Sequence, residues 1–157
     1  MDGDIGLRQR ERVADATLAP ESSRSAERLL ARLELPDAAN ELLAMVRFLT
    51  AADGPVRQLA DTGMSSPWHE RVLVKALERL EALDGFLRGR VAFFVAGRQH
   101  GYGVLETELD VAGAALDANR ALTVVVESLL RDELPTERQF DRMSEATMRI
   151  FAALERL

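Results

Sequence analysis

Five glycines within residues 85–103 limit how the middle of this chain can fold. A single α-helix through the segment would carry Gly85 and Gly89 in its interior, where each costs about 1 kcal/mol relative to alanine. The run that follows, Arg90–Ala96, is rich in valine and phenylalanine, which favour strands. The sequence therefore predicts that a helix ends at Gly85 and that a strand follows it.

A second extended run is expected at Val104–Leu109. Its residues alternate between two faces, a period of two that is typical of a half-buried strand. One face carries Leu105, Thr107 and Leu109, and the other carries Val104, Glu106 and Glu108. With the glycine-rich loop 97–103 between them, the two runs predict a β-hairpin.

Two helices are expected before the hairpin. A short one covers Pro55–Asp61, and after a turn a longer one begins at Ser66-Pro67. Serine can cap this helix, and proline at its first position loses no hydrogen bond. A helix, a turn, a second helix and a hairpin form a winged helix-turn-helix. The predicted fold class is therefore mainly α with a small β-hairpin.

The helices outside this unit suggest a dimerisation region. A long helix from Asp110 to about Arg131 is apolar on more than one side, as expected of a helix buried between the winged domain and a second subunit. Asn119 lies among its apolar positions, either to set the register of a dimer or as a satisfied core amide. Near the C-terminus, Thr136 and Gln139 fit a capping box.

The predicted domains follow from these elements. Residues 1–24 form a flexible N-terminal arm, and residues 37–113 form the winged helix-turn-helix domain. Residues 25–36 and 114–157 form the helical dimerisation region.

Composition excludes several classes of function. The chain has no cysteine and only two histidines, so thiolate chemistry is impossible and a histidine metal site is not expected. No nucleophile–base pair or phosphate-binding loop is present, and we predict no enzyme activity, no cofactor and no metal. The longest apolar run, Val91–Ala96, is far shorter than a membrane span. With a polar N-terminus, these features predict a cytoplasmic protein without membrane contact.

Charge is distributed unevenly along the chain. Residues 55–103 contain seven basic and five acidic residues, a local charge of +2, whereas the whole chain has a formal net charge of −6. A mildly positive patch on an acidic body is compatible with binding to double-stranded DNA.

The order of elements resembles the MarR family of bacterial transcriptional regulators. Three segments carry the resemblance: Arg79–Arg90 (RLEALDGFLRGR), Val104–Asn119 (VLETELDVAGAALDAN) and Glu133–Met143 (ELPTERQFDRM). The resemblance implies a homodimeric DNA-binding regulator, a repressor or an activator, that binds a pseudo-palindromic operator. It also implies that a small aromatic ligand modulates DNA affinity.

The expected DNA-binding residues belong to a recognition helix at about 67–83, placed in the major groove, and to a wing at 97–103 near the minor groove. They are Ser65, Ser66, Trp68, Arg71, Lys75, Arg79, Arg88, Arg90, Arg98, Gln99 and His100. Each also has a structural interpretation: Ser66 as a cap, Trp68 as a packing residue, and the cations as a solvated surface.

Two departures from the family pattern support an alternative function. Residues 101–103 read Gly-Tyr-Gly where the family has an acidic residue and an arginine. The start of the recognition helix reads Trp-His-Glu-Arg, whereas typical members carry small hydroxyl residues there. The alternative is a degenerate winged-helix dimer that does not bind DNA and acts through a protein partner.

Overall fold

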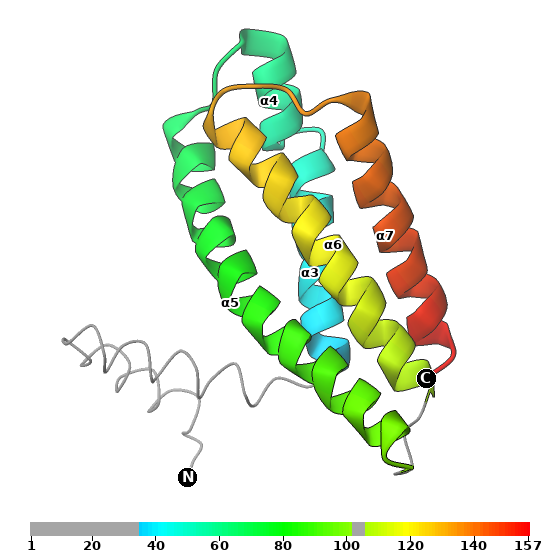
Figure 1. The fold of residues 1–157 in the computed structure, drawn as a ribbon. Helices are drawn as coiled ribbons and strands as arrows, with labels where there is room; N and C mark the ends of the chain where they lie inside the picture. The colour runs from blue at the N-terminus through cyan, green and yellow to red at the C-terminus, as the bar shows by residue number, and fades with distance from the viewer. Residues whose placement is uncertain (1–34, 102–105) are drawn as a thin grey trace, which may run out of the picture. The chain divides into compact units, whose positions relative to one another are not determined.

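The computed structural model describes residues 35–101 and 106–157, and this part of the chain is built from α-helices alone (Figure 1). The helices are α3 (Leu35–Thr50), α4 (Pro55–Thr62), α5 (Pro67–Gln99), α6 (Glu106–Leu130) and α7 (Glu137–Glu155). None of these helices combines the length and the apolar character needed to cross a membrane.

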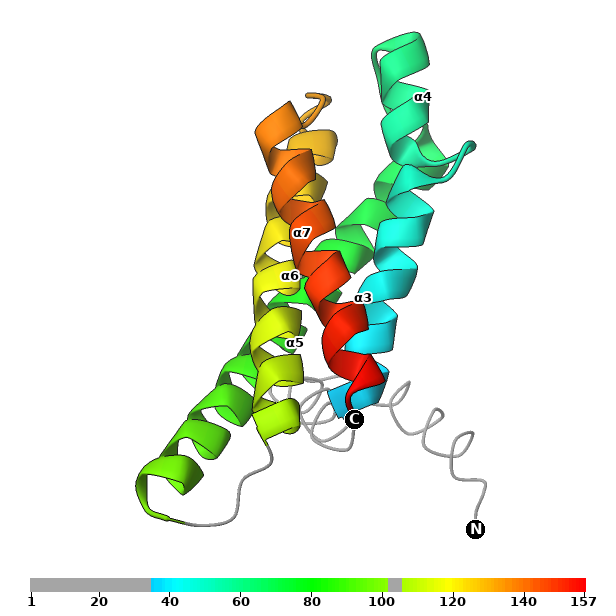
Figure 2. The same cartoon turned by 90° about the vertical axis from the view of Figure 1, so that its right-hand side faces the viewer.

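The four long helices run in alternating directions, with α3 and α6 pointing one way and α5 and α7 the other (Figures 1 and 2). Helix α6 is central, because it packs against α5, α7 and α3. The short α4 connects α3 to α5 at one end. Every long helix contributes a fully buried side chain to the shared core, for example Leu42, Leu73, Leu122 and Ile150. Burial of these apolar stripes holds the helices together.

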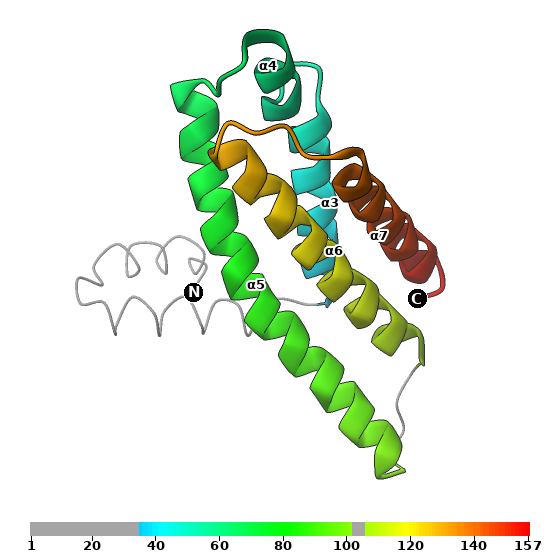
Figure 3. The ribbon, with the colours of Figure 1, turned by 45° about the horizontal axis from the view of Figure 1, so that its top comes forward.

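The first predicted strand is part of a helix. Helix α5 continues without a break from Pro67 to Gln99, through Gly85, Gly89 and the whole of 90–96 (Figure 3). The prediction of a β-hairpin wing is therefore wrong, and no strand is found among the described residues.

Packing explains why the helix continues past its glycines. The buried residues Leu73, Leu80, Leu83, Leu87 and Phe94 keep a helical spacing along the whole of α5. The two interior glycines cost roughly 2 kcal/mol together. Fully burying one leucine or phenylalanine contributes about 1.5–3 kcal/mol. Leu87 and Phe94, which follow Gly85, therefore offset that cost.

The second predicted strand is also helical where it is described. Helix α6 begins at Glu106, so residues 106–109 form its first turn. Glu106 and Glu108 favour a helix start, because carboxylates are stabilised by the positive end of the helix dipole. In the sequence these glutamates alternate with other residues at a period of two, and this pattern led to the prediction of a strand. Residues 102–105 and the predicted arm, 1–24, lie outside the described residues, as does most of 25–36.

Two predicted helix starts are confirmed. Ser66 caps α5, and its hydroxyl accepts a hydrogen bond of 3.1 Å from the backbone N–H of His69. Thr136 and Gln139 form the predicted capping box of α7, with bonds of 3.1 and 2.9 Å.

Candidate functional site

The residues predicted to contact DNA are distributed along α5 and do not form one cluster. Arg71 and Lys75 are exposed and one turn apart near its beginning. Arg98, predicted at the tip of a wing, lies in its last turn. With a rise of 1.5 Å per residue, Arg71 and Arg98 are separated by about 40 Å along the helix. In the predicted fold, the β-hairpin would have brought Arg98 back beside Arg71.

Three of the predicted arginines are engaged by carboxylates. Arg79 forms a two-pronged ion pair with Glu41 of α3, with one N–O distance of 2.9 Å. Arg88 bonds Asp84 one turn earlier at 2.9 Å. Arg98 reaches across to Glu106 at the start of α6, at 3.0 and 3.2 Å. Arg79 and Arg98 therefore connect helices.

The remaining predicted residues have varied surroundings. The guanidinium of Arg90 lies 5.5–6.0 Å from the ring centres of Phe86, Phe93 and Phe94. Trp68 is 56% exposed and meets Phe48 edge to face. Ser65 joins the start of α5 to the end of α6 through Asp132 and the Leu129 carbonyl. Gln99 and His100 are exposed at the end of α5.

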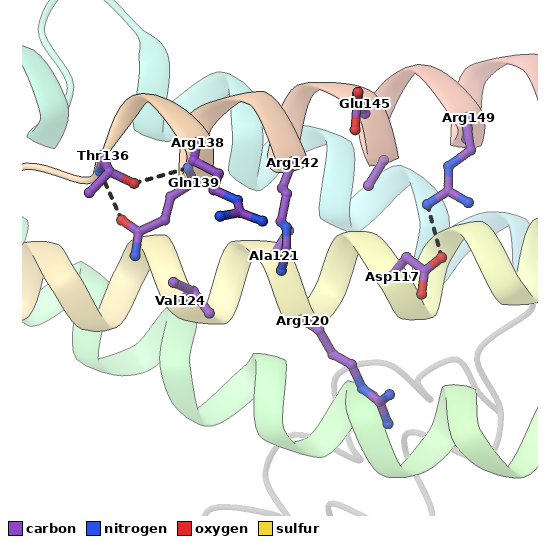
Figure 4. Close-up of a pocket in the computed structure, with 11 residues that line it drawn as sticks. Asp117, Arg120, Ala121, Val124, Thr136, Arg138, Gln139, Arg142, Glu145 and Arg149 are labelled. Carbon is purple, nitrogen blue, oxygen red and sulfur yellow. Dashed lines mark hydrogen bonds and ion pairs between the residues drawn. The ribbon is translucent and has the colours of Figure 1, made fainter.

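Arginines gather elsewhere, in a pocket between α6 and α7 (Figure 4). The pocket has a volume of about 820 Å³. Helix α6 contributes Asp117, Arg120, Ala121 and Val124 to its lining. Helix α7 contributes Arg138, Arg142, Glu145, Ala146 and Arg149, and its capping box borders one end. We call this the α6–α7 pocket.

Arg138 and Arg142 are the two pocket cations that have no partner among the described residues. They are one turn apart on α7, and both side chains extend toward α6 (Figure 4). Neither guanidinium makes a hydrogen bond or an ion pair to any residue in the described part of the chain. Glu145 is three residues from Arg142 and also lines the pocket, but no ion pair joins the two side chains. Two unneutralised charges therefore face the same space.

The other two arginines of the pocket have partners. Arg149 donates to Asp117 at 2.9 Å and so connects α7 to α6 at one end of the pocket. Arg120 turns toward α5 and bonds Asp84 at 3.1 Å. Counting four arginines and two carboxylates, the lining carries a charge of +2. This local charge is opposite in sign to that of the whole chain, −6.

Part of the pocket lining is apolar. Ala121 and Val124 come from α6 and Ala146 from α7. Val124 is 42% exposed, so a large part of this apolar side chain faces the pocket and solvent. The pocket thus offers an apolar surface next to positive charge.

The sequence predicted none of these pocket residues as a site. The available signal was the spacing of Arg138, Arg142 and Arg149, which places them on one face of a helix. That spacing is equally typical of a solvated helix surface. Only the packing of α7 on α6 shows that this face lies opposite Asp117 and Val124.

Comparison of the chain with protein-family models, curated proteins and solved structures finds no match. The resemblance to the MarR family therefore stays an expectation from sequence. The winged fold that it implied is contradicted by the helices of the described residues.

Proposed function

We propose that this helical protein binds an anionic ligand in the α6–α7 pocket. The observation that carries the proposal is the pair Arg138 and Arg142, two guanidiniums without a carboxylate partner among the described residues, directed into one pocket. The volume of about 820 Å³ lies within the range of small-molecule sites, about 300–1,000 Å³.

Electrostatics favours an anion at this position. Like charges four residues apart on a helix destabilise it by about 0.2–0.5 kcal/mol. An anion between Arg138 and Arg142 removes this repulsion and adds charge-assisted hydrogen bonds, which are about twice as strong as neutral ones. Arginine is suited to this role because its planar fork matches carboxylate and phosphate oxygens.

The experiment is a calorimetric titration with four simple anions: inorganic phosphate, pyrophosphate, phthalate and phenyl phosphate. We expect at least one to bind the native chain, and the double variant Arg138→Gln/Arg142→Gln to bind it at least tenfold more weakly. The matched control is Arg47→Gln/Arg57→Gln, which removes the same charge from exposed positions on α3 and α4 that do not line the pocket. Equal weakening by both double variants would contradict a local site.

Binding to double-stranded DNA by a homodimer stays a prediction. Its groove-reading geometry depended on a wing beside the Arg71–Lys75 face, and α5 continues as a helix where that wing was expected. The pocket proposal depends on no such element, because its residues lie on α6, α7 and the cap of α7.

A further inference from the structure

The charge and the surface of the α6–α7 pocket restrict the kind of anion that fits it. This inference rests on the proposed function and adds the ligand's chemical class. Two properties decide it: how the free charge is arranged, and what lies next to that charge.

The free charge is concentrated on one side of the pocket. Arg138 and Arg142 both come from α7 and are one turn apart, so one ligand group can meet both guanidiniums. A carboxylate carries a single negative charge, so it can neutralise only one of the two guanidiniums. A phosphate monoester has three terminal oxygens and carries about −1.5 to −2 charges at pH 7, which matches the +2 charge of the lining.

An apolar surface continues from the charged side. Val124 and Ala121 lie on the α6 wall opposite these arginines, and the Arg149–Asp117 ion pair lies further along the pocket (Figure 4). An inorganic ion at Arg138 and Arg142 would leave Val124 exposed. A ligand with a flat or aliphatic body attached to its phosphate would cover it.

We propose that the α6–α7 pocket takes a small phosphate monoester, with the phosphate between Arg138 and Arg142 and an apolar body against Ala121 and Val124. The two parts of the ligand then contact different residues, so substitutions can separate their contributions.

The same four probes test this class by their rank order. Phenyl phosphate is expected to bind about tenfold more tightly than inorganic phosphate, because its ring removes apolar surface of Val124 from water. It is also expected to bind more tightly than phthalate, a dianion with two carboxylates. Raising the pH from 5 to 7.5 should strengthen phenyl phosphate binding several-fold, because the second phosphate pKa is about 6. Sulfate, which stays a dianion throughout this pH range, is the reference for pH effects on the protein itself.

A polar substitution at Val124 separates the contribution of the apolar lining to binding from that of Arg138 and Arg142. Val124→Thr keeps the shape of the side chain and should remove most of the advantage of phenyl phosphate over inorganic phosphate. It should leave inorganic phosphate binding unchanged. Loss of both affinities in Val124→Thr would contradict the assignment of Val124 to the apolar body.

The outcomes distinguish the two proposals. If anions bind through Arg138 and Arg142 but phenyl phosphate binds no better than inorganic phosphate or phthalate, the monoester assignment is wrong and anion binding stands. If no anion depends on these arginines, both proposals are wrong.

Discussion

The side chain of Asn119 is buried without a hydrogen-bond partner among the described residues. It is 1% exposed in the middle of α6, and neither its amide oxygen nor its nitrogen has a partner in the described part of the chain. An unsatisfied buried polar group costs about 1–3 kcal/mol. Asn119 belongs to the core of a single chain, so no surface of it is left to set the register of a dimer in this structure.

We therefore predict that Asn119→Leu stabilises the protein. Leucine has a similar branched shape and needs no hydrogen bond, so the free energy of unfolding should rise by about 1–3 kcal/mol. Chemical denaturation followed by circular dichroism measures the change. Asn40→Leu, at an exposed position of α3, is the control and should change stability by less than about 0.5 kcal/mol. Destabilisation by Asn119→Leu would contradict this prediction.

Among the elements, α5 shows best how packing overrides local preference. Its glycines at 85 and 89 are exposed, and a methyl group at either would meet nothing within 4 Å beyond its chain neighbours and the nearby backbone of α5 itself. The helix has therefore no steric need for glycine at these positions. Helix α5 also extends past the beginning of α6 (Figure 3).

The double variant Gly85→Ala/Gly89→Ala is expected to be more stable than the native chain. Alanine is better than glycine by about 1 kcal/mol in a helix interior, so the two changes should add about 2 kcal/mol. For a protein of this size, each kcal/mol raises the thermal midpoint by about 2–4 °C. Differential scanning calorimetry provides the measurement.

Gly63→Ala is the opposing control for that experiment. Gly63 ends α4 with a φ of +81°, in the left-handed region that alanine disfavours, so this variant should lose about 1 kcal/mol. A loss of stability in Gly85→Ala/Gly89→Ala as well would indicate that α5 does not continue through its glycines.

For the whole molecule, ligand binding and folding are linked. The α6–α7 pocket requires two helices in contact, so a ligand that binds there stabilises the packed state over the unfolded chain. At a ligand concentration 100 times the Kd, this stabilisation is about 2.7 kcal/mol.

Phenyl phosphate at that concentration should thus raise the thermal midpoint by about 5–10 °C. Thermal unfolding followed by circular dichroism checks the shift. If Arg138→Gln/Arg142→Gln binds tenfold more weakly, the same concentration stabilises it by only about 1.4 kcal/mol, so its shift should be about half that of the native chain or smaller. Arg47→Gln/Arg57→Gln should behave as the native chain does. An undiminished shift after loss of both pocket arginines would place the ligand elsewhere.

Much of the local structure followed from the sequence alone. The caps at Ser66 and Thr136 depend on a few neighbouring residues, so their side-chain chemistry predicted where α5 and α7 begin. In the first half of α5, Leu73, Leu80 and Leu83 are buried, because leucines at helical spacing form an apolar stripe that another element has to cover.

Tertiary structure decided what local preference left open. Strand-forming residues and glycines at 85–96 predicted an interruption, but Leu87 and Phe94 are buried only if the helix continues. Likewise, the arginines of α7 form a site only because that face of α7 meets α6 across a pocket. In both cases the deciding contacts join residues far apart in the chain, and their free energy does not depend on neighbouring residues alone.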